Sequence, residues 1–367
     1  MKIFISGLAG FLGSHLADAH LARGDQVQGC DNLITGDRAN VPEGACFKPA
    51  DCADVARMTE MTVGADVIYH CAAVATEGLS VFSPAMVGQH TYQSTAGLLA
   101  AAATNTVARF VFCSSMARYG AGPIPFREDQ DPDPEDPYGI AKVAAEALVR
   151  NMGETHGFEW NIAVPHNVIG PRQRYDDPYR NVAAIMINRM LQGRQPVIYG
   201  DGGQKRCFSF VQDCVDPLVR LGTQHGLTGE VFNIGPDDEF VTILELATTV
   251  ADLLGFDLDP IYASARPREV RYATCSADKA RLLLGYRPKT GLREGLQSMV
   301  DWIRTQGPRP FRYDLPIEVQ SPLGFPRPGA ITSCSPPCTG YRVPCTVHRA
   351  PCTVHRFFVT SPTAVLS

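Results

Sequence analysis

Short apolar runs alternate with longer helical patterns through the first half of the chain. Four such runs lie at residues 2–6 (KIFIS), 26–32 (QVQGCDN), 65–73 (ADVIYHCAA) and 108–115 (ARFVFCSS). Apolar runs of a few residues that stop at a turn are typical of parallel strands covered on both faces. The segments 11–24, 94–104 and 138–152 predict helices. This alternation predicts an α/β fold with a doubly wound parallel sheet.

The pattern changes after about residue 165, where arginine, proline and glycine gather in PHNVIGPRQRYDDPYRN and IYGDGGQKRCFSF. We therefore expect a sheet domain over 1–165 and a smaller mixed α/β region over 166–318, with some of that chain crossing back to the sheet. Such a region packs over the carboxyl ends of the strands and leaves a substrate cleft between the two parts.

Residues 319–367 lose this globular character. PCTGYR, PCTVHR and PCTVHR begin at Pro337, Pro344 and Pro351 and so repeat with a period of seven. The cysteines and histidines of this segment lack a metal-ligand spacing such as CxxC, and we expect a disordered, low-complexity tail without a metal.

Composition narrows the class of protein. Hydrophobic residues make up 45% and charged residues 19% of the 367 positions, as in ordinary globular proteins. The net charge of −5 gives no general attraction to nucleic acid or to an anionic membrane, and no apolar run reaches the ~20 residues of a membrane span. We expect a cytoplasmic protein whose cysteines before residue 320 are single thiols rather than disulfides, most of them in apolar, buried runs.

A glycine triplet follows the first predicted strand. Gly7, Gly10 and Gly13 stand in GLAGFLG, with Phe11 and Leu12 between the last two, and a helical pattern follows. Glycines allow a tight turn and a close approach to a pyrophosphate, whose charge then lies at the amino terminus of the helix. The turn therefore predicts a dinucleotide site.

The second predicted strand ends in Asp31, 18 residues after Gly13. A carboxylate there accepts hydrogen bonds from the adenine ribose and repels the additional phosphate of NADP. The following Asn32 and Leu33 provide no arginine for that phosphate, so the sequence favours NAD.

Tyr138 and Lys142 occur in PYGIAKVAAE, four positions apart on a predicted helix. Positions i and i+4 share one helix face, so the ammonium group lies near the phenol. A neighbouring cation lowers the pKa of a tyrosine from about 10, which makes the phenolate available as a general base.

The GxxGxxG spacing and the Tyr-x-x-x-Lys pair resemble the extended branch of the short-chain dehydrogenase/reductase superfamily, over residues 1 to about 310. The resemblance implies a Rossmann domain and a catalytic triad completed by Ser115, with Ser114 supporting the cofactor. One departure is Ser94, which stands where the family usually has asparagine. The resemblance assigns the rest of the cofactor site to Asp51, Cys52, Cys71, Ala72 and Ala73.

The residues after Ser115 indicate the reaction by the same resemblance. Nucleotide-sugar 4,6-dehydratases have Thr-Asp-Glu there, UDP-glucuronate decarboxylases usually keep a glutamate, and GDP-sugar 3,5-epimerases use a cysteine. This chain has Met116 and Ala117, which move no protons. We therefore expect an NAD-dependent 4-epimerase that inverts C4 of a UDP-hexose of the UDP-glucose, UDP-N-acetylglucosamine or UDP-glucuronate type.

Three positions match family motifs for the substrate: Asn167 in HNVIGPR, Arg206 in GDGGQKRCF and Arg266 in ARPREV. Arginine forks suit a diphosphate. By the same alignment, Ala273 replaces a bulky residue that limits sugar size. The family generally forms homodimers through two helices, here near 97–103 and from Tyr138 onwards.

Two alternatives stay open at this point. One is a dehydratase or a net reductase of the same superfamily, and the other is a non-catalytic NAD-binding regulator. A nucleic-acid binder finds no support, because the chain has no basic patch.

Overall fold

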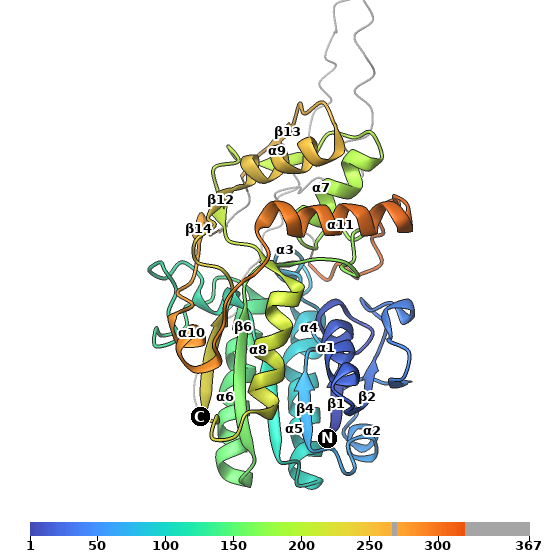
Figure 1. The fold of residues 1–367 in the computed structure, drawn as a ribbon, viewed down its shortest axis with the longest axis vertical. Coiled ribbons are helices and arrows are strands. Elements are labelled where there is room, and N and C mark those ends of the chain that lie inside the picture. The colour runs from blue at the N-terminus through green and yellow to red at the C-terminus, as the bar shows by residue number, and fades with distance from the viewer. Residues whose placement is uncertain (266–269, 320–367) are drawn as a thin grey trace, which may run out of the picture. The chain divides into compact units, whose positions relative to one another are not determined.

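A seven-stranded parallel sheet forms the centre of the part of the chain that the computed structural model describes, residues 1–265 and 270–319. Its order is β11–β6–β5–β4–β1–β2–β3, and every neighbouring pair is parallel (Figure 1). The order extends from β1 in both directions, which confirms the predicted doubly wound sheet. The strands are β1 (Lys2–Ser6), β2 (Gln26–Asp31), β3 (Cys46–Pro49), β4 (Val67–His70), β5 (Arg109–Cys113), β6 (Glu159–Pro165) and β11 (Glu230–Ile234).

Helices cover both faces of the sheet. Phe4 and Phe112 pack in a core with α2 (Val55–Met61), α5 (Ser94–Thr104) and α6 (Pro137–His156). Ile5 and Tyr69 pack in a second core with α1 (Phe11–Ala22) and α8 (Val211–Thr223). Side chains alternate between the two faces of a strand, so a sheet with two cores needs apolar residues at consecutive positions.

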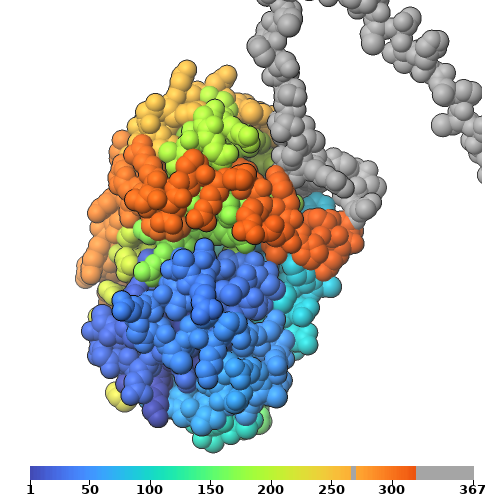
Figure 2. Space-filling model, turned by 90° about the vertical axis from the view of Figure 1, so that its right-hand side faces the viewer, coloured from blue at the N-terminus to red at the C-terminus, as the bar shows by residue number. Residues whose placement is uncertain are grey.

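A second layer lies beyond the carboxyl ends of the strands (Figure 1). Its helices α7 (Val182–Leu191), α9 (Ile243–Leu254) and α11 (Leu292–Gln306) share a core that includes Ile187, Leu246 and Val300. Figure 2 shows α11, in orange, above the blue residues of the amino-terminal half. The small strands of this region are β7 (Val168–Ile169), β8 (Val197–Tyr199), β9 (Lys205–Arg206), β10 (Ser209–Phe210), β12 (Val241–Thr242), β13 (Ile261–Ala263) and β14 (Tyr272–Ala273).

The remaining elements are short. They are η1 (Arg38–Asn40), α3 (Glu77–Ser80), α4 (Pro84–Gly88), the π-helical turn η2 (Gln89–Gln93), η3 (Met116–Tyr119) and α10 (Asp278–Leu284). Between β10 and β12 the chain returns to the main sheet through α8 and β11, and β11 pairs with β6. Residues 211–234 thus belong to the sheet although they follow the first segments of the second layer.

The four predicted strands correspond to β1, β2, β4 and β5, and the predicted helix over 94–104 is α5 with the same bounds. The eight cysteines of the described residues are free thiols. None of the helices in that part of the chain is long and apolar enough to span a bilayer. Arg266 and the seven-residue repeats lie outside the described residues.

Candidate functional site

The glycine turn joins β1 to α1. Gly7 has φ +72°, and a Cβ there would lie 2.8 Å from the backbone nitrogen of Ala72. A Cβ on Gly13 would lie well inside contact distance of the Gly7 carbonyl oxygen. Gly10 is the N-cap of α1 and supplies no side-chain acceptor, so the first amides of the helix face the turn. This cradle, with Phe11 and Leu12 in the first helical turn, fits the pyrophosphate of NAD.

Asp31 ends β2 beside this turn. Its Oδ1 accepts a hydrogen bond from the amide of Leu33 at 2.8 Å. Burial raises the pKa of the Asp31 carboxyl, and hydrogen bonds from the backbone of Leu33 and Ala9 oppose that shift. Asn32 donates to Asp51 Oδ2 at 3.2 Å, next to His90. A carboxylate at each of two neighbouring strand ends suits the hydroxyls and ring nitrogens of an adenosine.

Cys52 is less exposed than its neighbour Asp51. Its Sγ lies 3.7 Å from Cys30 Sγ inside the core, and its side chain is 5% exposed. Any contact of Cys52 with a cofactor therefore comes from its backbone.

The end of β4 is held by a buried histidine. His70 Nδ1 lies 2.6 Å from Ser6 Oγ, and its Nε2 lies 2.9 Å from Thr95 Oγ1. Thr95 gives its own proton to the Thr91 carbonyl, so His70 Nε2 donates and His70 Nδ1 accepts from Ser6. This chain of bonds fixes the strand end that leads into residues 71–73.

Residues 71–73 lie between the glycine turn and the Tyr138–Lys142 pair. Cys71 Sγ lies 3.6 Å from Cys113 Sγ, and the Ala72 amide donates to Ser6 Oγ at 3.4 Å. Ala73 packs against the small cluster that contains Tyr138. Because Ala72 touches Gly7, this segment places the phenol on the glycine-turn side of the molecule. Ser94, the departure from the family pattern, is buried and donates to the Thr91 carbonyl at 3.1 Å.

Tyr138 lies in the first turn of α6. The Asp136 side chain caps this helix by accepting from the Gly139 amide at 2.9 Å, with Pro137 at the first position. One turn later, Lys142 Nζ lies 5.8 Å from the centre of the Tyr138 ring and donates to the Cys113 carbonyl at 2.7 Å. The structure therefore brings the two predicted partners together on one helix face.

Burial decides the protonation of this pair. Burial, and then the charge of Glu77, raise the pKa of the Tyr138 phenol above its ordinary value, while a hydrogen bond with Ser115 and the charge of Arg180 oppose the shift. Burial likewise lowers the pKa of Lys142 to about 8. The expected depression of the tyrosine pKa is thus outweighed here by the loss of solvation.

Two serines follow β5 and have different partners. Ser115 Oγ caps η3 by accepting from the Ala117 amide at 3.2 Å, and it interacts with the Tyr138 phenol. Ser114 Oγ donates to Glu146 Oε1 at 2.5 Å. Glu146 also pairs with Arg118 at 3.3 Å, and both side chains are almost fully buried. Ser114 is therefore a supporting residue, and Ser115 is the one beside the phenol.

The predicted substrate residues lie in the second layer. Asn167 has φ +38° and donates to the Cys207 carbonyl at 2.9 Å. Arg206 donates to the carbonyls of Lys205 at 2.9 Å and Arg271 at 3.2 Å. Ala273 is buried in β14, which pairs with β9 beside Arg206. The structure thus places Arg206 and Ala273 together and holds the guanidinium against main-chain carbonyls.

Arg180 was missed by motif reasoning. Its guanidinium lies 3.3 Å from Asp177 and 3.5 Å from the Ala75 carbonyl. Its charge acts on both Tyr138 and Asp31, so the guanidinium lies near the phenol and near the carboxylate that ends β2. The only signal in the sequence was its place in the arginine-rich stretch PRQRYDDPYRN. That stretch contains three arginines, and no pattern in the sequence distinguishes one of them as a site residue.

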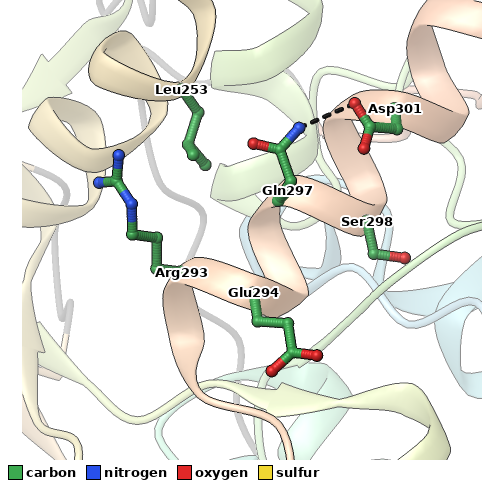
Figure 3. A pocket seen from close by; sticks show the side chains of 6 residues that line it. All are labelled: Leu253, Arg293, Glu294, Gln297, Ser298 and Asp301. Atoms are coloured by element: carbon green, nitrogen blue, oxygen red, sulfur yellow. Dashed lines mark hydrogen bonds between the residues drawn. The ribbon is translucent and has the colours of Figure 1, made fainter.

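A separate groove of about 690 Å³ runs along the outer side of α11 beside α9 (Figure 3). Its lining residues are Leu253, Arg293, Glu294, Gln297, Ser298 and Asp301, and Gln297 donates to Asp301 at 2.8 Å. It contains none of the residues assigned above to the cofactor or to catalysis.

Comparison with known proteins identifies the family of this chain. A model of the NAD dependent epimerase/dehydratase family matches residues 3–235. The UDP-glucose 4-epimerase of Mycolicibacterium smegmatis is 33% identical over 317 residues, covering 83% of this chain and 99% of the relative. UDP-glucuronic acid decarboxylase 3 of Arabidopsis thaliana is 31% identical over 317 residues, covering 83% of this chain and 89% of the relative.

Among solved structures, the UDP-glucose 4-epimerase of Thermotoga maritima with UDP-glucose has a TM-score of 0.78 at 32% identity. The likeness covers 83% of this chain and 99% of that one. This chain therefore belongs to the NAD dependent epimerase/dehydratase family, and its cofactor is NAD.

Proposed function

We propose that this protein is a nucleotide-sugar 4-epimerase that inverts C4 of a UDP-hexose through a 4-keto intermediate. The observation that carries the proposal is the set of side chains around the reacting hydroxyl. Ser115, Tyr138 and Lys142 come together, while the η3 positions that bear an acid and a base in dehydratases hold Met116 and Ala117. This set moves one proton at one hydroxyl, and C4 inversion needs no other acid or base.

The residues divide the work in the following way. The Tyr138 phenolate takes the proton of the C4 hydroxyl and later returns it to the same oxygen. Ser115 donates a hydrogen bond to that oxygen and holds it within reach of the phenol. The Lys142 ammonium stabilises the negative charge on Tyr138. NAD, when bound by the glycine cradle and Asp31, supplies the acceptor for the C4 hydride and gives the hydride back.

Inversion requires the ketone to present its other face before the hydride returns. We infer that the second layer holds the nucleotide diphosphate while the hexose turns, with Asn167, Arg206 and Arg266 as the candidate contacts. The buried Ala273 methyl next to Arg206 leaves room for a substituent on the sugar. Arg180 adds a cation near Tyr138, which is why an anionic hexose such as UDP-glucuronate belongs among the candidate substrates.

A homodimer is part of this proposal. Ile140 on α6 is 56% exposed, and Val143, Ala144 and Ala147 continue the same outer face without a charged group. Exposed apolar faces of this kind often mark an interface. Sedimentation of the parent protein and of an Ile140→Lys variant tests it, and a dimer that persists unchanged in the variant contradicts the use of this face.

The decisive experiment is incubation with a panel of UDP-glucose, UDP-N-acetylglucosamine and UDP-glucuronate, followed by NMR of the anomeric and C4 protons. We expect the C4 epimer of at least one sugar, with no net consumption of NAD. A 4-keto-6-deoxy sugar or a pentose product with release of CO₂ would instead identify a dehydratase or a decarboxylase. Formation of stoichiometric NADH would identify a net oxidoreductase. Tight binding of NAD without turnover of any UDP-sugar in the panel would identify a non-catalytic regulator.

A further inference from the structure

Three buried side chains from distant parts of the chain meet beneath the second layer. His166 follows β6, Cys207 follows β9, and Cys275 comes two residues after β14. One ligand atom of each lies within 4.8 Å of those of the other two, and all three residues are 0% exposed. None of them belongs to the set that we assign to catalysis.

The proton of the His166 ring is fixed by Asn233. The Asn233 amide nitrogen donates to the carbonyls of Phe126 at 3.1 Å and Ser276 at 3.5 Å, and its Oδ1 accepts from Tyr119 at 2.8 Å. That Oδ1 is therefore an acceptor toward His166 Nε2, 3.3 Å away, and Nε2 carries the proton.

The other nitrogen of the ring is left as a lone pair. His166 Nδ1 is buried and makes no direct hydrogen bond among the described residues, although the Cys207 thiol interacts with the ring. A buried nitrogen lone pair without a donor costs free energy unless a cation or a proton donor satisfies it. The orphan nitrogen and the two thiols belong to one side-chain cluster.

We propose that His166, Cys207 and Cys275 bind a thiophilic cation, for which Zn²⁺ is the probe. Zinc lies about 2.3 Å from thiolate sulfur and about 2.0–2.1 Å from imidazole nitrogen, so the ligand atoms of a tetrahedral site lie roughly 3.5–3.8 Å apart. A group already confined within 4.8 Å reaches this geometry with small side-chain shifts. Binding releases the two thiol protons, and a water molecule completes four-fold coordination.

Asn233 matches the outer shell of such a site. Histidine ligands commonly donate their second nitrogen to an oxygen acceptor, which orients the ring and sets the tautomer. Here the acceptor is itself oriented by its bonds to Tyr119 and Phe126, so the ring is pre-arranged for Nδ1 ligation.

The cation would act on the substrate-binding region, and this part of the inference rests on the proposed function. Asn167 follows His166 and donates to the Cys207 carbonyl at 2.9 Å, and Arg206 precedes Cys207. Cys207 Sγ also lies 4.0 Å from the carbonyl oxygen of Ala273. A shared ligand would therefore hold together the three segments that carry Asn167, Arg206 and Ala273.

The test measures metal, not turnover. Full-length protein is given Zn²⁺ with a non-chelating phosphine reductant and dialysed, and zinc is then counted by inductively coupled plasma mass spectrometry. We expect Cys207→Ser and Cys275→Ser to hold one zinc per chain less than the parent, and Cys214→Ser, a buried cysteine on α8, to match the parent. Zinc should also raise the thermal unfolding midpoint of the parent and of Cys214→Ser only.

A second measurement removes the dependence on those variants. The carboxyl-terminal segment has its own cysteines, so a protein with Cys334, Cys338, Cys345 and Cys352 changed to serine is loaded with Co²⁺. We expect a thiolate-to-cobalt charge-transfer band from this protein, because the folded cluster keeps its two sulfurs.

The absence of that band overturns the proposal, as does equal zinc in the parent and in Cys207→Ser. Mass spectrometry gives a further outcome. If the protein is lighter by two hydrogens, if a reductant restores the mass and if the change maps to a Cys207–Cys275 peptide pair, the cluster forms a disulfide and does not bind a cation. Because no readout uses a sugar, failure of the metal site and failure of the 4-epimerase assignment are seen separately.

Discussion

The Lys142 ammonium lies 5.8 Å from the centre of the Tyr138 ring and donates to the carbonyl of Cys113. The same helix thus carries the proposed base and the cation that stabilises its ionised form, and the lysine is tied to the end of the strand that also leads to Ser115. Burial acts on both groups, raising the pKa of the phenol and lowering that of the amine.

Replacing Tyr138 with phenylalanine removes the proton acceptor and leaves the packing of the ring intact. We expect turnover of the accepted UDP-sugar to fall by about 10²–10⁴-fold, the usual contribution of a positioned general base. NMR of the product sugar measures it. Tyr286→Phe is the matched control, because that hydroxyl is buried and has no partner among the described residues. Unchanged turnover in Tyr138→Phe would remove the proposed mechanism.

The pH profile reports the Tyr138–Lys142 pair as a unit. The reactive form of the pair has a phenolate and an ammonium group, and it holds one proton fewer than the fully protonated pair. The form with a phenol and a neutral amine holds the same number of protons, so both forms appear in the same titration step. Since the pKa of Lys142 is lowered to about 8, kcat/KM should rise with pH and level off above about pH 8. In Lys142→Met only the phenol of the pair can still lose a proton, and the pKa of that phenol is raised. The rise of kcat/KM should therefore move to higher pH. If the pH profile of kcat/KM is the same in the variant as in the parent, the titrations of Tyr138 and Lys142 are not coupled.

Glu146 balances a buried cation. Its carboxylate pairs with Arg118, whose Nε and Nη1 have no other partner among the described residues. We expect Glu146→Gln to lower the free energy of unfolding by about 3–5 kcal/mol, as when one partner of a buried ion pair is removed. Urea denaturation measures the loss. Adding Arg118→Met should recover most of it, and a double variant as unstable as the single one would speak against the ion pair as the cause.

His70 makes stability depend on pH. Burial, and then the charge of Lys142, lower its pKa to about 3, against the ordinary value of 6.5. Between these values the unfolded chain binds a proton that the native protein does not bind, so stability falls as pH falls, by up to roughly 1.4 kcal/mol per pH unit. We expect His70→Gln to flatten this part of the curve in urea titrations at pH 6.5 to 4. The exposed His156→Gln serves as the control and should keep the parent slope.

Asp31 is expected to select NAD. Losing a hydrogen bond to a charged group costs about 1.5–3 kcal/mol, so Asp31→Ala should weaken NAD binding by roughly 10–100-fold. Calorimetric titration of the NAD-free protein measures it, with Asp301→Asn on α11 as the control. Combining Asp31→Ser with Asn32→Arg should favour NADP, and no gain in NADP affinity would place the ribose elsewhere.

The sequence by itself determined the elements whose signals are local. The strand β1, the glycine turn and α1 follow from consecutive residues, because apolar runs, the left-handed φ of Gly7 and helix periodicity are properties of short segments. The Tyr138–Lys142 pair is equally local, since one helical turn separates its members.

Tertiary structure alone decided what depends on contacts between distant segments. Arg180 faces Tyr138 only through the path of the second layer, and nothing in its neighbours distinguished it from Arg172 or Arg174. The return of β11 to the sheet and the meeting of His166, Cys207 and Cys275 likewise have no spacing pattern. The direction of the pKa shift of Tyr138 also required the fold, because desolvation depends on what packs around a group, whereas a sequence shows only which charges are near it along the chain.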